Sequence, residues 1–334
     1  MLKTLLNLKS VRACISSRFA LTLLVTVMIV TTAIPPHSNA QTTPPAAQQY
    51  TFVSLSAPFP GVTSTLGYGV NDRGDVVGAY QINPDPLGNP TTAGQHGFVL
   101  KNGTYTTIDV PFPGATSTGA VGINNHGVIV GSYSDGSFHG FVLRRGVFTS
   151  FDFPGPNAVD TSANGINDEG TIVGDYFDLV SQQRRGFILE RGIFYSVDVP
   201  FTGACCTSAG GINNRGHIVG SYIGADGVGH GFTLKRGTFT TFDQSFPPDF
   251  PAPFASQNAL PCGISNRGEI VGPGFLFLHG DFTQLSDLDP FFEIVGGGTC
   301  GVNDKGIVVG NTMPNLVNPP PLGNSAAGFL LMPE

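Results

Sequence analysis

One phrase repeated six times, four strand-length segments in each copy and a repeat divided between the two chain ends predict an all-β protein. The expected architecture is a single six-bladed β-propeller of four-stranded blades over residues 51–334, closed where the N-terminal strand pairs with the C-terminal blade. Residues 41–50 are expected to be a linker, and residues 1–40 a signal peptide.

The repeated phrase reads GINNHGVIVGSY at residue 122 and GINNRGHIVGSY at residue 211. Successive copies lie 53, 43, 46, 52 and 38 residues apart. Periods of this length are typical of solenoids, propellers and other repeat arrays. The six copies begin at Gly69, Gly122, Gly165, Gly211, Gly263 and Gly301.

Each copy contains four strand-length segments separated by turn signals. In the second copy, STGAVGIN is followed by the turn NNHG, then VIVGSY, HGFVL, the turn RRG and VFTSFDF. Turns of this kind between β-branched runs are hairpin signals. Because apolar residues fall on both faces of these segments, we expect each sheet to be covered on both sides, as in stacked blades.

The repeat is divided between the two ends of the chain. The sixth copy reaches Glu334 without a fourth strand, whereas YTFVSLSAPFPGVTST at 50–65 matches YTTIDVPFPGATST at 105–118. Pairing of the first strand with the last blade would remove the exposed edges of an open array. A solenoid or a propeller with another number of blades is the alternative.

The first forty residues predict export. Lys3, Lys9, Arg12 and Arg18 lead into an apolar run, which is followed by Ser-Asn-Ala ending at Ala40. The apolar run is about 16 residues long, and a membrane-spanning helix needs about 20. We therefore expect cleavage after Ala40 and a secreted, periplasmic or cell-surface protein without a membrane span, the alternative being an uncleaved anchor.

Composition narrows the class of partner. The expected cleavage removes four basic and no acidic residues, which moves the net charge from −7 to −11. This charge disfavours nucleic acid and anionic membranes as partners. With 46 Gly, 26 Pro and 40% hydrophobic residues, the chain has the composition of a folded, turn-rich protein.

Four cysteines remain after cleavage and are candidates for disulfides in an oxidising compartment. Cys262 and Cys300 each directly precede the first Gly of a repeat. A bond between them, or from one of them to Cys205 or Cys206, is expected, and buried free thiols are the alternative.

The third segment of each copy carries a family resemblance. Together with GINxxGxIVGxY, the triplets beginning at His96, His139 and His230 read His-Gly-Phe, which resembles the bacterial HAF extracellular repeat family. The triplets beginning at Arg185, Pro273 and Ala327 depart from it. The resemblance implies an exported, propeller-like protein and names no activity or catalytic residue.

The loops divide into two groups, which are expected at opposite ends of the blades. The turns after the first and third strands are short and form the turn face. The loops after the second and fourth strands vary in length and form the variable face, where binding is usually found. The variable face contains the loops 81–95, 177–183, 223–229, 244–261 and 311–327.

Charge separates in the same way. Ten of the twelve basic residues after Ala40 fall on the turn face, whereas fourteen of the 23 acidic residues fall on the variable face beside Arg184 and Arg185. This distribution predicts a negative surface that favours Ca²⁺, other cations or basic partners. The alternative is that the acidic residues only keep an exported protein soluble.

Repeated residues of the variable face are the candidate binding groups. The Asp of the IDVP-like segments could ring the face as ligands or cap its own turn. The Tyr that closes each second strand could touch a ligand in the central channel or serve packing. The candidates are Asp109, Asp152, Asp198, Asp243, Tyr80, Tyr133, Tyr176 and Tyr222, with Asp287, Asp289 and Glu293 as oxygen ligands for Ca²⁺.

The sequence favours a non-enzymatic function. It contains no G-x-S-x-G elbow in a strand-to-helix setting, no H-E-x-x-H and no phosphate-binding loop before a helix. We expect a monomeric binding scaffold for a protein, peptide or cation, with no catalytic residue and no cofactor except possible Ca²⁺. The alternatives are a hydrolase or lyase with channel-mouth carboxylates and a divalent metal, and a lectin-like carbohydrate-binding module.

Overall fold

The computed structural model describes residues 50–82, 94–243, 260–278, 281–284, 301–312 and 327–334. These residues form strands and turns, with no helix among them, so the prediction of an all-β fold is confirmed. The chain divides into two compact units, residues 1–46 and 47–334, and every described residue belongs to the second. The predicted signal peptide, and the predicted linker apart from Tyr50, lie outside the described residues.

No helix long and apolar enough to cross a membrane is found in the described part of the chain.

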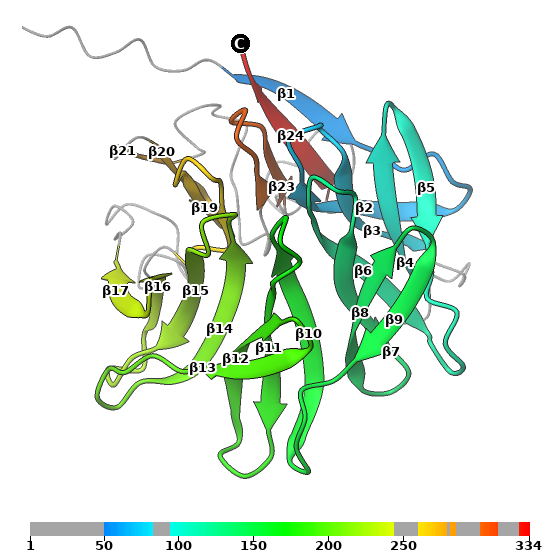
Figure 1. The fold of residues 1–334 in the computed structure, drawn as a ribbon. Helices are drawn as coiled ribbons and strands as arrows, with labels where there is room; N and C mark the ends of the chain where they lie inside the picture. Colours follow the sequence, from blue (N-terminus) through cyan, green and yellow to red (C-terminus); the bar gives the residue numbers. More distant parts are fainter. Residues whose placement is uncertain (1–49, 83–93, 244–259, 279–280, 285–300, 313–326) are drawn as a thin grey trace, which may run out of the picture. The chain divides into compact units, whose positions relative to one another are not determined.

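Three of the sheets each contain four antiparallel strands that follow one another in the sequence (Figure 1). The first sheet contains β10 (Ala158–Ile166), β11 (Ile172–Asp178), β12 (Gln183–Glu190) and β13 (Ile193–Val197). The second contains β14 (Cys205–Ile212), β15 (Ile218–Ile223), β16 (Gly229–Lys235) and β17 (Thr238–Phe242). The third contains β18 (Gly263–Ile264), β19 (Ile270–Gly272), β20 (Phe275–Leu278) and β21 (Asp281–Gln284).

The fourth sheet has twelve strands in three antiparallel runs. The first two runs are joined by the single pair Gln95 and Ser117, and the first and third by the single pair Thr65 and Ala327. The first run is β2 (Val62–Val70), β3 (Val76–Ile82), β4 (Gln95–Lys101) and β5 (Thr104–Ile108). The second is β6 (Ser117–Ile123), β7 (Ile129–Ser134), β8 (Phe138–Arg144) and β9 (Val147–Phe151). The third is β22 (Gly301–Val302), β23 (Val308–Thr312), β24 (Ala327–Pro333) and β1 (Tyr50–Leu55).

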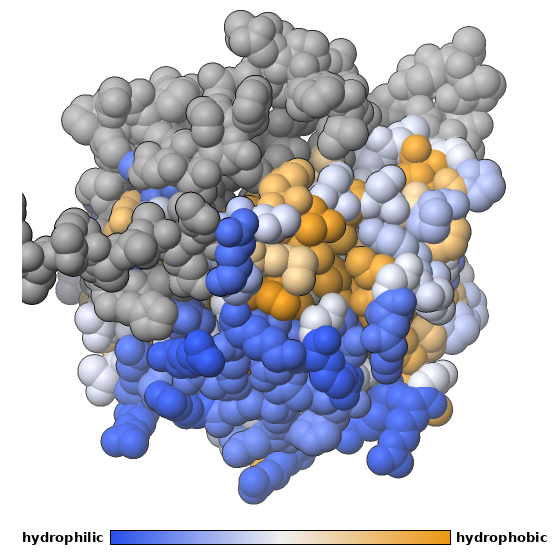
Figure 2. All heavy atoms as spheres, turned by 90° about the horizontal axis from the view of Figure 1, so that it is seen from above, coloured by the Kyte–Doolittle hydropathy of each residue, from blue (hydrophilic) through white to orange (hydrophobic). Residues whose placement is uncertain are grey.

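The two ends of the second unit pair with each other. Strand β1 runs antiparallel to β24 over six residue pairs, from Tyr50 opposite Pro333 to Leu55 opposite Gly328. The divided repeat predicts this pairing, and Figure 1 shows the two strands side by side. Phe52 and Met332 on this pair remain exposed, and Figure 2 shows apolar side chains gathered in the middle of the face seen from above.

Glycine and phenylalanine at fixed repeat positions explain how each sheet is packed. The Phe of each third strand is 0–1% exposed. Its ring lies against the Gly of the IVG or VVG segment in the second strand, so that a Cβ added at Gly174 would lie 2.8 Å from the Phe187 ring. Burial of one such ring stabilises the fold by about 1.5–3 kcal/mol. The six rings belong to Phe98, Phe141, Phe187, Phe232, Phe275 and Phe329.

The first turn of each copy is closed by its own leading side chain. In the first copy, Asn71 Oδ1 accepts hydrogen bonds from the backbone N–H groups of Arg73 and Asp75, both at 3.0 Å. Gly74 completes the turn at φ +84°, a left-handed conformation that favours glycine. The repeated Asn-x-x-Gly pattern is therefore a requirement of the turn.

Candidate functional site

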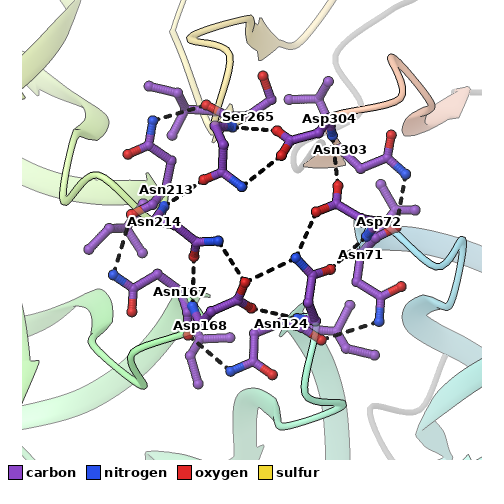
Figure 3. A pocket seen from close by; sticks show the side chains of 18 residues that line it. Asn71, Asp72, Asn124, Asn167, Asp168, Asn213, Asn214, Ser265, Asn303 and Asp304 are labelled. Atoms are coloured by element: carbon purple, nitrogen blue, oxygen red, sulfur yellow. Dashed lines mark hydrogen bonds between the residues drawn. The ribbon is translucent and has the colours of Figure 1, made fainter.

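The six first turns surround a small pocket of about 70 Å³ on the turn face (Figure 3). The second residue of each turn donates its backbone N–H to the side chain of the second residue of the next copy, at 2.7–2.8 Å. Six such bonds form a closed cycle, because the sixth turn donates to the first. The cycle runs through Asp72, Asn125, Asp168, Asn214, Asn266 and Asp304, and is called the turn ring below.

A second set of bonds supports the turn ring. The first residue of a turn donates its side-chain amide to the backbone carbonyl of the next copy, as Asn167 does to Asn213 at 3.3 Å. Four other copies repeat this contact, and Ser265 in the fifth copy instead bonds Glu269 at 3.0 Å. The turn face is therefore held together by hydrogen bonds between copies.

The carboxylates of the turn ring are engaged by neighbouring amides. Asp168 Oδ2 accepts hydrogen bonds from Asn125 at 3.0 Å and Asn214 at 2.6 Å, and Asp304 Oδ2 accepts one from Asn266 at 2.9 Å. In the described part of the chain, no group of three His, Cys, Asp or Glu residues is placed to hold a metal ion. The turn ring therefore joins neighbouring copies by hydrogen bonds. Sequence reasoning missed this role, although every copy has Asp or Asn as the second residue of its first turn.

On the variable face, each of the four candidate Asp residues meets the residue that begins the His-Gly-Phe triplet, or its equivalent, in the third strand of its own copy. Nδ1 of His96, His139 and His230 lies 2.9 Å from its Asp, and the guanidinium of Arg185 lies at the same distance from Asp198. The four candidates therefore do not meet one another. The pairs are His96–Asp109, His139–Asp152, Arg185–Asp198 and His230–Asp243.

In three copies a second Asp completes a clamp around the His or Arg side chain. Nε2 of His139 lies 3.1 Å from Asp135, and the equivalent distance from His230 to Asp226 is 3.2 Å. Arg185 is held in the same way, 3.2 Å from Asp178. Partial burial disfavours the charged form of His139, but the hydrogen bonds and charges of its two Asp partners outweigh burial and raise the pKa of His139; the pKa of His230 is raised in the same way.

The candidate tyrosines lie beneath these clamps. Tyr80, Tyr133 and Tyr222 stack on the His of their own copy with ring centroids 5.1–5.2 Å apart. Tyr80 also hydrogen-bonds Thr107 at 2.9 Å, and Tyr133 bonds Ser150 at 2.9 Å. With Tyr176, all four are 4–7% exposed, which agrees with the packing interpretation.

The remaining predicted residues divide by position. Asp287, Asp289 and Glu293, the predicted Ca²⁺ ligands, lie outside the described residues. Cys205 and Cys206 are free thiols facing each other, so the predicted bond from Cys262 or Cys300 to either of them is wrong. A bond between Cys262 and Cys300 stays a prediction, because Cys300 lies outside the described part of the chain.

A larger cavity of about 290 Å³ is lined by residues that differ from copy to copy. Its polar centre is Asp175, which is 6% exposed. Asp175 Oδ2 accepts hydrogen bonds from Asn164 at 2.9 Å and Ser208 at 2.8 Å, and Oδ1 accepts one from Arg184. Repeat-equivalent positions carry Ala79, Ser132, Ser221, Pro273 and Asn311.

The cavity wall also carries hydroxyl groups and apolar surface. The Tyr68 and Ser221 hydroxyls line it and have no hydrogen-bond partner among the described residues. Burial raises the pKa of Tyr68 to about 12, so its hydroxyl stays protonated. Leu260 and Pro261 provide apolar surface. Sequence reasoning missed this cavity. The available signal was Asp175 in IVGDY, because no other copy has an acidic residue at the equivalent position.

No family model and no curated protein matches the chain. AofleA from Arthrobotrys oligospora is similar over 80% of this chain and 84% of its own, with 10% identity and a TM-score of 0.45. XC5397 from Xanthomonas campestris, described as a gluconolactonase, is similar over 81% of this chain and 87% of its own, with 10% identity and a TM-score of 0.44. A subtype N11 neuraminidase-like protein of A/flat-faced bat/Peru/033/2010 (H18N11) is similar over 85% of this chain and 94% of its own, with 12% identity and a TM-score of 0.44. Likenesses at these TM-scores carry no conclusion about function.

Proposed function

We propose that residues 51–334 form a six-bladed propeller and act as an exported, non-enzymatic binding scaffold that uses the variable face. The six-membered turn ring, the β1–β24 pairing and the two single-pair joints within the large sheet support six units of four strands. The His-Gly-Phe triplets support membership of the HAF-type repeat proteins.

The observation that carries the functional proposal is the row of fixed carboxylates on the variable face. The side chains of Asp109, Asp152, Asp198 and Asp243 are 39–53% exposed although each is held by a His or Arg. The described part of this face contains nine Asp residues and two Arg residues. Pre-positioned negative groups on rigid strands favour a basic protein or peptide, or a cation, as the partner.

A lysine-rich peptide at low ionic strength tests this proposal. Wild-type protein is expected to bind the peptide with an affinity that falls as salt is added. Asp109→Asn combined with Asp152→Asn should weaken binding at least about tenfold, equivalent to about 1.4 kcal/mol. Glu190→Gln combined with Asp281→Asn removes the same charge from the turn face and is the matched control. Equal losses in both double variants, or no binding by the wild type, would overturn the proposal.

A second candidate function rests on the 290 Å³ cavity. Its unpartnered Tyr68 and Ser221 hydroxyls can each donate and accept a hydrogen bond. The Asp175–Arg184 ion pair leaves this part of the wall without net charge. Free hydroxyls beside apolar surface suit a small neutral polyhydroxylated ligand, which is the lectin-like alternative.

A panel of neutral monosaccharides, titrated into the protein and followed by calorimetry, tests this second function. Tyr68→Phe and Ser221→Ala should each weaken binding of any sugar that the wild type binds. The matched controls are Tyr133→Phe, which removes a hydroxyl that bonds Ser150, and Ser132→Ala at the position equivalent to Ser221. No heat of binding across the panel, or equal losses in the controls, would reject the cavity as a sugar site.

A further inference from the structure

Two adjacent cysteines in β14 have their sulfur atoms in contact. Cys205 Sγ and Cys206 Sγ are 2.9 Å apart. In a regular strand, successive side chains point to opposite faces, which would hold adjacent thiols apart. Here the pairing of β14 with β15 shifts register between Cys205 and Ser208, and Cys206 has a φ of +58°. A β-bulge therefore turns the two thiols toward each other.

The bulge belongs to the fold and does not depend on the cysteines. In the third copy, the pairing of β10 with β11 shifts register between Val159 and Ser162, and Asp160 has a φ of +52°. Val159 and Asp160 occupy the positions equivalent to the two cysteines. The backbone thus already holds an adjacent pair of side chains in this geometry where no sulfur is present.

Both thiols are free and partly exposed, so a small reagent can reach them. Burial, and the neighbouring Cys205, raise the pKa of Cys206. At neutral pH the Cys206 thiol is therefore largely protonated, and the reactivity of the pair comes from the enforced proximity of its two sulfur atoms.

We propose that Cys205 and Cys206 form a redox site that closes to a disulfide between adjacent residues, independently of the proposed binding functions. With a small-molecule disulfide such as oxidised glutathione as the oxidant, one Cys thiolate attacks a glutathione sulfur and releases the first glutathione thiol. The second Cys thiolate then attacks the protein sulfur of the mixed disulfide and releases the second glutathione thiol. The two protons of the cysteines end on the two glutathione thiols, and two electrons pass to the oxidant.

Peptide mass analysis tests the proposal directly. No Lys or Arg lies between Arg191 and Arg215, so one tryptic peptide, residues 192–215, contains both cysteines and no other. Native protein is incubated with oxidised glutathione, alkylated, denatured and digested without reduction. The expected peptide lacks two hydrogen atoms and carries no alkyl group, and dithiothreitol restores two alkylatable thiols. A doubly alkylated peptide, a stable glutathione adduct, or a link to a peptide carrying Cys262 or Cys300 would overturn the proposal.

Two controls separate the contribution of the bulge from ordinary thiol chemistry. Cys206→Ser should stop the reaction at the glutathione adduct of Cys205. The folded protein should need at least about tenfold less oxidised glutathione for half-closure than the protein in denaturant, equivalent to about 30 mV for this two-electron couple. Equal requirements in the two states would reject the proposed role of the bulge.

Discussion

The turn face and the variable face belong to the same repeats, but their side chains bond in different directions. On the turn face, polar side chains reach the next copy, across 38–53 residues of sequence and across 232 residues where the turn ring closes. On the variable face, each of the four candidate Asp residues meets a His or Arg of its own copy, 13 residues away. A change in one of these four pairs therefore disturbs one copy, whereas a change in the turn ring also disturbs the neighbouring copies.

The largest effect is expected from breaking the turn face at Asn213. This side chain is 3% exposed, accepts hydrogen bonds from the N–H groups of Arg215 and His217, and donates one to Ser265. Asn213→Ala leaves these groups unsatisfied, and we expect a loss of about 3 kcal/mol in the free energy of unfolding. Urea unfolding measures the loss, and a change below about 1 kcal/mol would contradict the role given to the turn face.

A smaller effect is expected when the turn ring keeps its shape and loses one charge. In Asp168→Asn, an amide replaces the carboxylate that accepts hydrogen bonds from the side-chain amides of Asn125 and Asn214. We expect the free energy of unfolding to fall by about 2 kcal/mol. Asp304→Asn disturbs one amide donor, that of Asn266, and should cost about half as much. Urea unfolding of both variants checks the order, and the reverse order would be inconsistent with the turn ring.

The two faces should also respond to pH in opposite directions. On the variable face, the raised pKa values of His139 and His230 give stabilisation that is complete below the unfolded value of about 6.5 and is lost as pH rises through the folded-state values. On the turn face, burial and then the charges of Lys235, Arg215 and Arg236 lower the pKa of His217. Protonation of His217 therefore destabilises the fold as pH falls below about 6.5.

Thermal unfolding between pH 5 and 8 measures these contributions. His139→Gln combined with His230→Gln should lower Tm mainly at the acidic end of the range. His217→Gln should raise Tm relative to wild type at the same end, since it removes a group that loses stability when protonated. The same sign of change in both variants at the acidic end would contradict the contrast between the faces.

The smallest effect is expected from a single pair on the variable face. Asp152→Asn removes one carboxylate from His139, which keeps Asp135 as a partner. Because Asp152 is half exposed, we expect a change below about 1 kcal/mol in the free energy of unfolding. A loss as large as that of Asn213→Ala would remove the distinction between the two faces.

The repeats predict the parts of the fold that recur from copy to copy. The Asn-x-x-Gly turns and the β1–β24 pairing follow from the phrase itself and from the match between residues 50–65 and 105–118. The His–Asp pairs were missed as pairs, although their constant separation of 13 residues was available in the sequence. A separation of 13 residues brings His and Asp together only once the register between the third and fourth strands is known.

The cavity around Asp175 could not be predicted in this way. Of its polar groups, Asn164 and Asp175 belong to the third copy and Ser208 to the fourth, and Asp175 is the only acidic residue at its repeat position. They become neighbours when β14 lies beside β10 and β11, and a repeat pattern does not report which deviations will meet. Repetition describes what the copies share, whereas this site depends on what they do not share.

The pairing of β1 with β24 bears on how the polypeptide reaches its native state. Tyr50 lies in the first described strand of the sequence, and its partner Pro333 lies in the last one. The earliest strand to emerge from the ribosome must therefore wait for the latest one before its backbone groups are satisfied, and contacts so distant in sequence make folding slow. Until residues 328–333 have been synthesised, β1 lacks these partners and presents an unpaired strand edge, through which one chain can pair with another.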